Sequence, residues 1–173
     1  AGVMEIEASK AAFASIAFLP RTLLLVNQGQ EYGCEIKPPM QIRRFPNEKS
    51  DSDLERFYSD VFFFKNSQLF SQGQWNIADV HTYSQNLIAL HVTSPDRKIS
   101  GVVCVNLGNE TADCSVPCVQ HGEKAAVYSL NQGLWIQPDE QRVDGLFLRL
   151  SPFESQIILY ESKVQQEVRL QWN

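Results

Sequence analysis

The sequence predicts an α+β protein in two unequal parts: a helix–strand–helix segment over residues 1–68 and an antiparallel β-sandwich over residues 69–173. Two observations support this prediction. Before Leu69 the apolar residues follow helical spacing on either side of one apolar run. From Leu69 onward, short β-branched runs alternate with turn signals. The 173 residues suffice for one large domain, or for a modest domain with an appendage.

Two helices are predicted in the first part. Residues 3–19 are rich in alanine and end at Pro20, which cannot continue a helix. Residues 51–65 follow the capping segment Ser50–Asp53. The stripe expected to be buried on this second helix recurs at helical spacing and comprises Leu54, Phe57, Tyr58, Val61 and Phe62. Phe63 and Phe64 broaden the stripe, so we expect this helix to be covered on more than one side.

Between the helices, residues 22–28 form an apolar run that predicts a buried strand. The run leads into Gly29-Gln30-Glu31-Tyr32-Gly33, a polar loop bounded by two glycines. In parallel sheets and barrels, active-site residues stand at this end of a strand. A buried strand needs neighbours on both edges, and one helix–strand–helix unit does not supply them.

The second part predicts about eight short strands, in segments such as "NLIALHVTS", "KISGVVCVNLG" and "SQIILYES". Turn signals such as Ser94-Pro95-Asp96 and Asn131-Gln132-Gly133 separate them. We expect no helix in this part, and residues 164–173 allow at most one last strand or an ordered arm. Strands at this spacing are typical of an antiparallel sandwich or barrel.

Charge and hydropathy exclude several classes of partner. The net charge is −5, with 15 basic and 20 acidic residues, and Arg43-Arg44 is the only local basic group, so we expect no nucleic-acid partner. No run of about 18 apolar residues occurs, so we expect no membrane span. The N-terminal stretch carries Glu5, Glu7 and Lys10 where a signal peptide would have its basic and apolar regions. Both a cytoplasmic and a secreted location therefore remain open.

The four cysteines allow more than one interpretation. Unpaired thiols are favoured, with Cys104 facing inward on a strand, and a disulfide among Cys104, Cys114 and Cys118 remains an alternative. A zinc site at Cys114-x-x-x-Cys118 with His121 would need a further ligand at suitable spacing. We therefore expect no metal and no cofactor.

Taken together, these segments resemble the C-terminal end of the α-amylase family of glycoside hydrolases. Four family signatures match in order: "LPGTPLIYYGQE", a final barrel helix like "FYRKLIALRKENPAL", a "VVLNFS" strand and a closing "LPPYEALVL" strand. The matching residues here are Leu19, Pro20, Thr22, Gly29, Gln30 and Glu31, then Phe57, Tyr58, Asn66 and Leu69, then Val103, Val105 and Asn106, and finally Leu150, Pro152 and Glu154. The chain departs from the family where Arg21 replaces a glycine and Leu23 a proline.

This resemblance implies the last βα unit of a (β/α)8 barrel followed by the C-terminal all-β domain. The family's three catalytic carboxylates stand on barrel strands four, five and seven, which would all lie upstream of Ala1. The whole protein would act on α-glucans or related oligosaccharides, and this chain alone is expected to be inactive. Retaining hydrolysis needs two carboxyl groups about 5 Å apart. Glu31 and Glu35 are the only acids near the end of the expected strand, so no catalytic residue is assigned.

Three residues are candidates for sugar contact. By resemblance, Gln30 and Glu31 stand on one wall of the active site, and Trp135 offers a flat apolar face for a pyranose ring. Trp75 and Tyr83 are weaker candidates for the same stacking role. Cys34 and His91 are not expected to act as nucleophile or base.

Two alternatives to a glycosidase fragment remain: a non-catalytic carbohydrate-binding or interaction module, and a catalytically inactive relative of the family. A barrel unit without its neighbours would leave an apolar surface uncovered. We therefore expect either self-association through that surface or tight packing of the helices and the apolar run onto the sandwich.

Overall fold

A computed structural model of the chain describes residues 6–34, 36, 47–117, 119, 124–138, 140–142 and 145–161. The helical segments, in chain order, are α1 (Ile6–Ala17), the 3-10 helix η1 (Gln30–Tyr32), α2 (Ser52–Asn66) and α3 (Gln68–Gln72). The strands are β1 (Gln74–Ile77), β2 (His81–Thr82), β3 (Leu87–Thr93), β4 (Ile99–Asn106), β5 (Ala112–Val116), β6 (Ala125–Ser129), β7 (Leu134–Ile136), β8 (Glu140–Arg142), β9 (Gly145–Leu150) and β10 (Ser155–Glu161).

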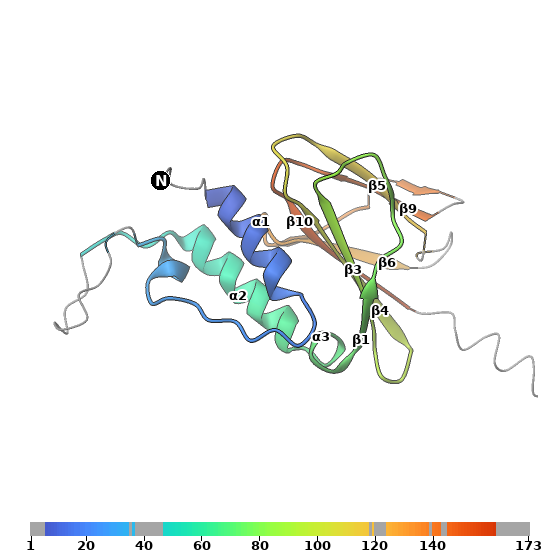
Figure 1. The fold of residues 1–173 in the computed structure, drawn as a ribbon, viewed down its shortest axis with the longest axis horizontal. Helices are drawn as coiled ribbons and strands as arrows, with labels where there is room; N and C mark the ends of the chain where they lie inside the picture. Colours follow the sequence, from blue (N-terminus) through green and yellow to red (C-terminus); the bar gives the residue numbers. More distant parts are fainter. Residues whose placement is uncertain are drawn as a thin grey trace, which may run out of the picture.

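The elements stack in three layers, with helices on one face of a six-stranded sheet and a four-stranded sheet on the other (Figure 1). The large sheet has the order β1-β3-β4-β10-β6-β7 and the small one β2-β5-β9-β8, with antiparallel neighbours throughout. This arrangement confirms an α+β protein with antiparallel sheets, as the alternating pattern predicts.

Strand β4 lies in the middle layer and shows why its sequence is almost entirely apolar. Val103 and Val105 pack against the helices, while Val102 and Cys104 face the small sheet. Successive side chains of a strand point to opposite faces, and both faces here are covered, so both sets are buried. Cys104 is buried as expected.

Helices α1 and α2 lie side by side and run in the same direction (Figure 1). Asp51 caps α2 by accepting hydrogen bonds from the backbone amides of Asp53 at 2.9 Å and Leu54 at 3.1 Å. The expected stripe is confirmed for Leu54, Phe57, Tyr58 and Val61, which are all buried. Phe62 is only partly buried, and Phe64 completes the buried face, while Phe63 is 73% exposed.

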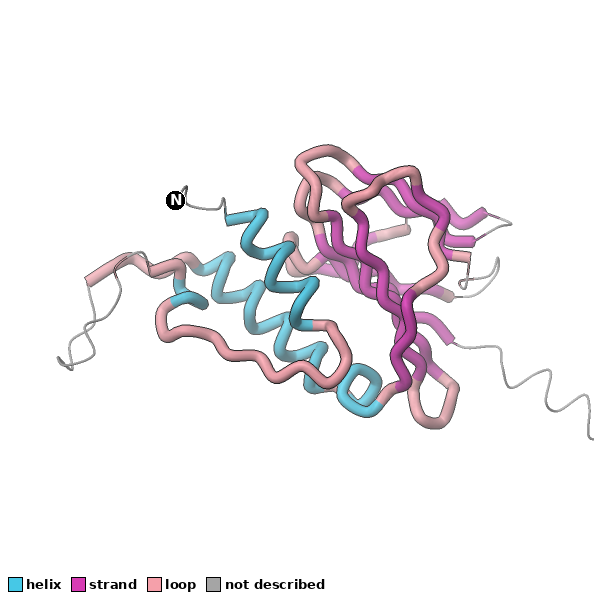
Figure 2. The backbone as a smooth tube through the Cα atoms, viewed as in Figure 1, coloured by secondary structure: helices cyan, strands magenta, loops and turns pink. Residues whose placement is uncertain are grey.

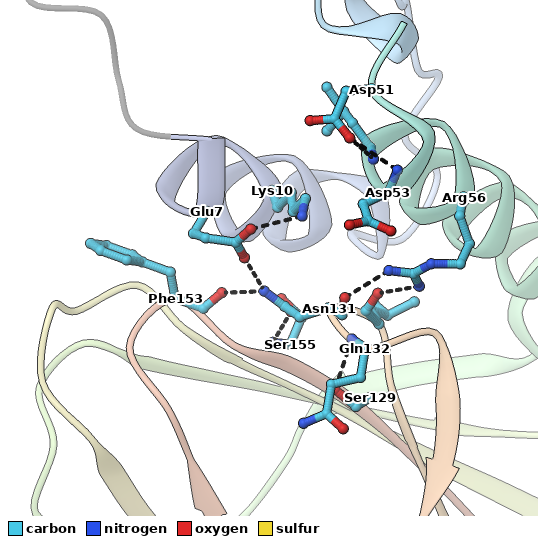
Figure 3. Close-up of polar contacts among 12 residues, drawn as sticks. Glu7, Lys10, Asp51, Asp53, Arg56, Ser129, Asn131, Gln132, Phe153 and Ser155 are labelled. Atoms are coloured by element: carbon cyan, nitrogen blue, oxygen red, sulfur yellow. Dashed lines mark hydrogen bonds and ion pairs between the residues drawn. The ribbon is translucent and has the colours of Figure 1, made fainter.

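A polar network fastens the helices to the sandwich (Figure 3). The Arg56 guanidinium on α2 donates to the carbonyl oxygens of Leu130 at 3.3 Å and Asn131 at 2.7 Å. The Asn131 side-chain amide donates to the Glu7 carboxylate on α1 at 2.7 Å and to the Phe153 carbonyl at 3.2 Å. Both helices are therefore held to the same turn after β6, and the expected tight packing onto the sandwich is confirmed for the helices only.

The expectation of a buried strand over residues 22–28 is wrong for this chain. The segment returns alongside α2 without pairing to any described strand (Figure 2). Leu24 and Val26 pack against the helices, but Leu23 is 88% and Leu25 92% exposed. The exposure of the side chains therefore alternates along the segment as it does in a strand, but no second layer covers the outward-facing ones. The physical reason is that nothing in the described chain supplies the neighbouring strands.

Several other expectations need correction or lie outside the described residues. The short helix α3 extends past Leu69, where no helix was predicted. Cys118, His121, Glu35, the Arg43-Arg44 pair and residues 164–173 lie outside the described residues. The boundary between residues 68 and 69 stays a prediction.

Candidate functional site: the loop that follows the unpaired segment

The candidate site is the turn that ends the unpaired segment, from Gly29 to Gly33. Both glycines have left-handed backbones, with φ of 91° and 72°, which cost other residues energy. A Cβ atom on Gly29 would lie 3.1 Å from the Cβ of Cys34, because the Cys34 amide folds back to donate to the Gly29 carbonyl at 2.9 Å. The glycines thus set a tight turn that presents Gln30 and Glu31.

Gln30 is held rigidly in this turn. Its Nε2 donates to the Tyr58 hydroxyl on α2 at 2.8 Å, and its Oε1 accepts from the Asn27 amide at 3.3 Å. These bonds occupy both ends of the side-chain amide, so Gln30 ties the turn to α2. Burial raises the pKa of the Tyr58 hydroxyl, which therefore stays protonated at neutral pH.

Glu31 differs from Gln30 in its hydrogen bonding. Its Oε2 is buried and has no hydrogen-bond partner among the residues that the structure describes. A buried carboxylate oxygen without a hydrogen-bond donor costs free energy. This oxygen therefore needs a partner that the described residues do not supply. The structure therefore brings Gln30 and Glu31 together in one turn. The Gln30 amide retains a second N–H donor beyond these bonds, and Glu31 retains an unpartnered carboxylate oxygen.

Cys34 does not supply a nucleophile to this turn. Partial burial raises the pKa of its thiol, and the nearby carboxylates of Glu48 and Glu31 raise it further. All of these effects favour the unreactive thiol over the thiolate. The expected effect of Glu31 on the Cys34 thiol agrees with this direction, whereas Glu35, the other acid expected to act, lies outside the described residues.

Trp135 lies elsewhere, on the edge strand β7, and is 54% exposed. Its ring centroid is 5.1 Å from that of its cross-strand partner Tyr128 and 6.3 Å from that of Phe64. Trp135 thus packs near Phe64 of α2, whereas the Gln30 turn contacts α2 at Tyr58. Tyr83 is fully exposed, and Trp75 is partly buried against Phe70.

The arrangement offers recognition groups and no assembled catalytic pair within the described ranges. Among those residues, no group of three His, Cys, Asp or Glu side chains is placed to hold a metal ion. His91, which the sequence does not favour as a base, hydrogen-bonds the Tyr160 hydroxyl at 2.9 Å, and burial lowers its pKa. No helix in the described part of the chain is long and apolar enough to span a membrane.

A second feature, which the sequence did not predict, is a groove where α1, α2 and α3 end beside β1. It is lined by residues 17–22, 65–66 and 70–75 and has a volume of about 680 Å³. One available signal was Arg21, which stands where the resembled family has glycine. In the structure Arg21 has a φ of 58°, the left-handed conformation that glycine adopts most readily.

Three solved structures, two of them named as α-amylases, share this fold over 91% of the chain. The noncanonic maltogenic α-amylase AmyB of Thermotoga neapolitana aligns with a TM-score of 0.65 at 11% identity. The α-amylase of Geobacillus thermoleovorans, complexed with acarbose, aligns at 0.63 and 15%, and AmyP in complex with maltose at 0.61 and 14%.

The chain spans 37%, 34% and 35% of these structures, respectively. The predicted resemblance is therefore confirmed in the fold, and this share is consistent with the C-terminal portion of an amylase. No known family profile matches the chain, and no curated protein matches its sequence.

Proposed function

We propose that this chain is the C-terminal portion of an α-amylase-family glycosidase that acts on α-glucans or related oligosaccharides when whole. In this proposal residues 1–68 are the last βα unit of a (β/α)8 barrel, and residues 69–173 are its C-terminal β domain. The family's catalytic carboxylates would then lie on earlier barrel strands, outside this chain.

One observation carries the proposal: a strand-like segment without strand neighbours leads into the candidate site. No amide of Leu23–Val26 donates a backbone hydrogen bond to another described residue. Leu23 and Leu25 point away from the helices, as the inward-facing residues of a barrel strand would. Adding barrel strands along this segment would bury both leucines and pair these amides.

Gln30 and Glu31 would then stand at the carboxyl end of the last barrel strand, where barrel enzymes place their active sites. The hydrogen bond to Tyr58 holds Gln30 in place in one wall of the site. The unpartnered Oε2 of Glu31 would accept a hydrogen bond from a barrel side chain or from a sugar hydroxyl. Both residues are proposed as substrate-binding residues.

The proposal is tested by measuring maltooligosaccharide hydrolysis with residues 1–173 alone and with the native polypeptide purified from its source. We expect hydrolysis by the native polypeptide only. Glu31→Gln in that polypeptide should lower kcat/KM by about tenfold, the effect of one weakened hydrogen bond. A native polypeptide with the mass of residues 1–173, or hydrolysis by residues 1–173 alone, would contradict the proposal.

A second candidate function is carbohydrate binding without catalysis, which the exposure of Trp135 favours. A stacking tryptophan should be open to solvent beside another aromatic ring, and Trp135 lies so beside Tyr128. Affinity electrophoresis in soluble starch tests this function. Trp135→Ala should abolish any retardation, while Tyr83→Ala, at an exposed ring on the small sheet's side, should leave it unchanged. Equal retardation of all three proteins would exclude Trp135 as the binding residue.

A further inference from the structure

The groove beside α3 lies at the opposite end of the unpaired segment from the Glu31 turn. Its lining begins at Ala17 and includes Thr22, whereas the turn starts at Gly29. An extended chain rises about 3.3 Å per residue, so the two sites lie roughly 20 Å apart. The volume of about 680 Å³ falls within the range of small-molecule sites. Any ligand of the groove would therefore be separate from a substrate at the turn.

One wall of the groove is a rigid aromatic surface. Trp75 and Phe70 line it together, with ring centroids 5.7 Å apart. The indole Nε1 of Trp75 donates to the Phe70 carbonyl at 3.2 Å, which fixes the orientation of the ring. A fixed, partly exposed indole face suits the apolar C–H face of a sugar ring.

The rim of the groove is rich in neutral amides. Asn66, Gln72 and Gln74 all line it and are exposed. Within the part of the chain that the structure describes, none of the three side chains has a hydrogen-bond partner. Each amide can donate and accept, which matches the hydroxyl group of a sugar.

The two cations of the groove do not make it an anion site. Among the residues that the structure describes, no acidic one lines the groove, and the cationic ones are Lys65 and Arg21. The Lys65 ammonium donates to the Ala17 carbonyl at 2.5 Å, at the C-terminal end of α1, where the helix dipole is negative. α2 also ends here, at Asn66, and adds a second negative dipole end. The helix ends therefore offset this positive charge, and a neutral ligand is favoured.

Arg21 provides independent support for a binding role. Its left-handed backbone costs a non-glycine residue free energy that glycine would not lose. Arg21 is also one of the residues that line the groove, and its guanidinium carries five N–H donors. Residues held in such conformations gather at functional sites, so the unfavourable backbone points to a role for the side chain.

We propose that this groove binds a short neutral oligosaccharide, with one sugar ring against Trp75 and its hydroxyl groups bound by Gln72, Gln74, Asn66 and Arg21. The choice of α-linked glucose as the sugar rests on the proposed function. The groove would then be a second, non-catalytic contact for the same glucan chain.

The test is a titration of ¹⁵N-labelled residues 1–173 with maltotriose, followed by NMR. We expect shifts of the Trp75 indole N–H and of the Asn66, Gln72 and Gln74 side-chain amides. The double variant Gln72→Ala/Gln74→Ala should bind about tenfold more weakly, because two hydrogen bonds are lost. The matched control Gln85→Ala removes an exposed amide outside the groove and should bind like the unaltered chain.

Three outcomes would overturn the proposal: no shifts with maltotriose, shifts confined to Trp135, or equal weakening by Gln85→Ala. A parallel titration with inorganic phosphate checks the charge argument, and groove shifts with phosphate but not maltotriose would also overturn it. Hydrolysis by the native polypeptide is measured separately. Its presence without groove shifts would refute only the groove, and its absence alongside groove shifts would refute only the glycosidase.

Discussion

Two apolar runs of this chain have similar sequences and different environments. Strand β4 pairs with β3 on one edge and β10 on the other, and both of its faces are covered. The side chains of residues 22–28 also point alternately to two faces. This segment pairs with no described strand, however, and only one of its faces is covered. The comparison shows that a β pattern specifies which side chains can be buried, whereas the neighbours decide whether they are.

The same contrast separates the two halves of the helical layer. On the sandwich side, the layer is closed by buried aromatic rings and by the Arg56–Asn131–Glu7 network. On the opposite side, it presents Leu23 and Leu25 to solvent. The layer is therefore covered towards the β domain and is uncovered, among the described residues, along the unpaired segment.

The largest expected effect comes from comparing the same substitution, leucine to alanine, in the sandwich core and in the unpaired segment. Leu148 in β9 is 1% exposed and Leu25 is 92% exposed. Leu148→Ala should lower the free energy of unfolding by about 3 kcal/mol, because it leaves a cavity. Leu25→Ala should change it by less than about 0.5 kcal/mol in this chain. Urea unfolding measures both, and a Leu25 effect as large as that of Leu148 would show that the segment is covered.

The next effect concerns the network that closes the sandwich side. Arg56→Ala should lower the free energy of unfolding by about 2 kcal/mol, since it removes charged hydrogen bonds to two backbone carbonyls. Arg149→Ala is the matched control, because its guanidinium pairs with Asp113 at 2.8 Å on the exposed surface. An exposed pair contributes about 0–1 kcal/mol. Equal losses in urea unfolding would refute the importance of the network.

The hydrogen bond between Tyr128 and α2 makes the stability of the sandwich side of the helical layer depend on pH. The Tyr128 hydroxyl donates to the Asp60 carboxylate at 2.9 Å, and burial and this carboxylate raise the pKa of Tyr128 to about 12. Tyr128→Phe should cost about 1 kcal/mol at neutral pH. Because the folded pKa exceeds the ordinary value of 10.0, this stabilisation is present below pH 10 and is lost as pH rises towards 12. The difference between the two proteins in urea unfolding should therefore shrink over that range, and a constant difference would argue against the bond.

A smaller effect separates two residues with the same backbone strain. Arg21 and Arg97 both have a φ of 58°. Replacing either by glycine should stabilise the fold by about 0.5 kcal/mol, because relief of the left-handed conformation slightly exceeds the entropy that glycine loses. Only Arg21→Gly should weaken maltotriose binding in the groove. Weakening by both variants, or by neither, would contradict a side-chain role for Arg21.

The smallest effect on stability comes from the open side of the layer. At a protein concentration low enough for both proteins to be monomeric, the double variant Leu23→Ser/Leu25→Ser should leave the free energy of unfolding within about 0.5 kcal/mol of the original. We propose that residues 1–173 self-associate through this surface, so the variant should be monomeric where the unaltered chain is not. Sedimentation velocity compares the two, and identical association states would refute the surface.

Much of the fold could be predicted from the sequence because local signals and tertiary contacts agree there. The capping side chain of Asp51 and the apolar stripe from Leu54 to Val61 predict α2, and the structure places both as expected. The signature residue Glu154 also has a physical role, since its buried carboxylate accepts hydrogen bonds from Ser129 and the Ser151 amide.

The predictions fail where tertiary contacts, and not the local sequence pattern, decide the structure. Burial of residues 22–28 depends on strands that the described chain does not contain, so the apolar run alone predicts too much. The groove escaped prediction because its lining joins the end of α1 to the consecutive elements α2, α3 and β1, which lie much further along the chain. Gln30 was predicted as a sugar ligand, but its bond to Tyr58, 28 residues away, has no sequence signal.

Hydrogen exchange of the Leu23–Val26 amides, compared between residues 1–173 and the native polypeptide, shows whether residues 22–28 belong to a larger barrel sheet. In residues 1–173 these amides donate no backbone hydrogen bond to a described residue and should exchange almost as fast as in an unfolded chain. In the native polypeptide, pairing with barrel strands should slow them by about a hundredfold or more. Equally fast exchange in both would contradict the account, since residues 22–28 would then have no strand neighbours in the whole protein.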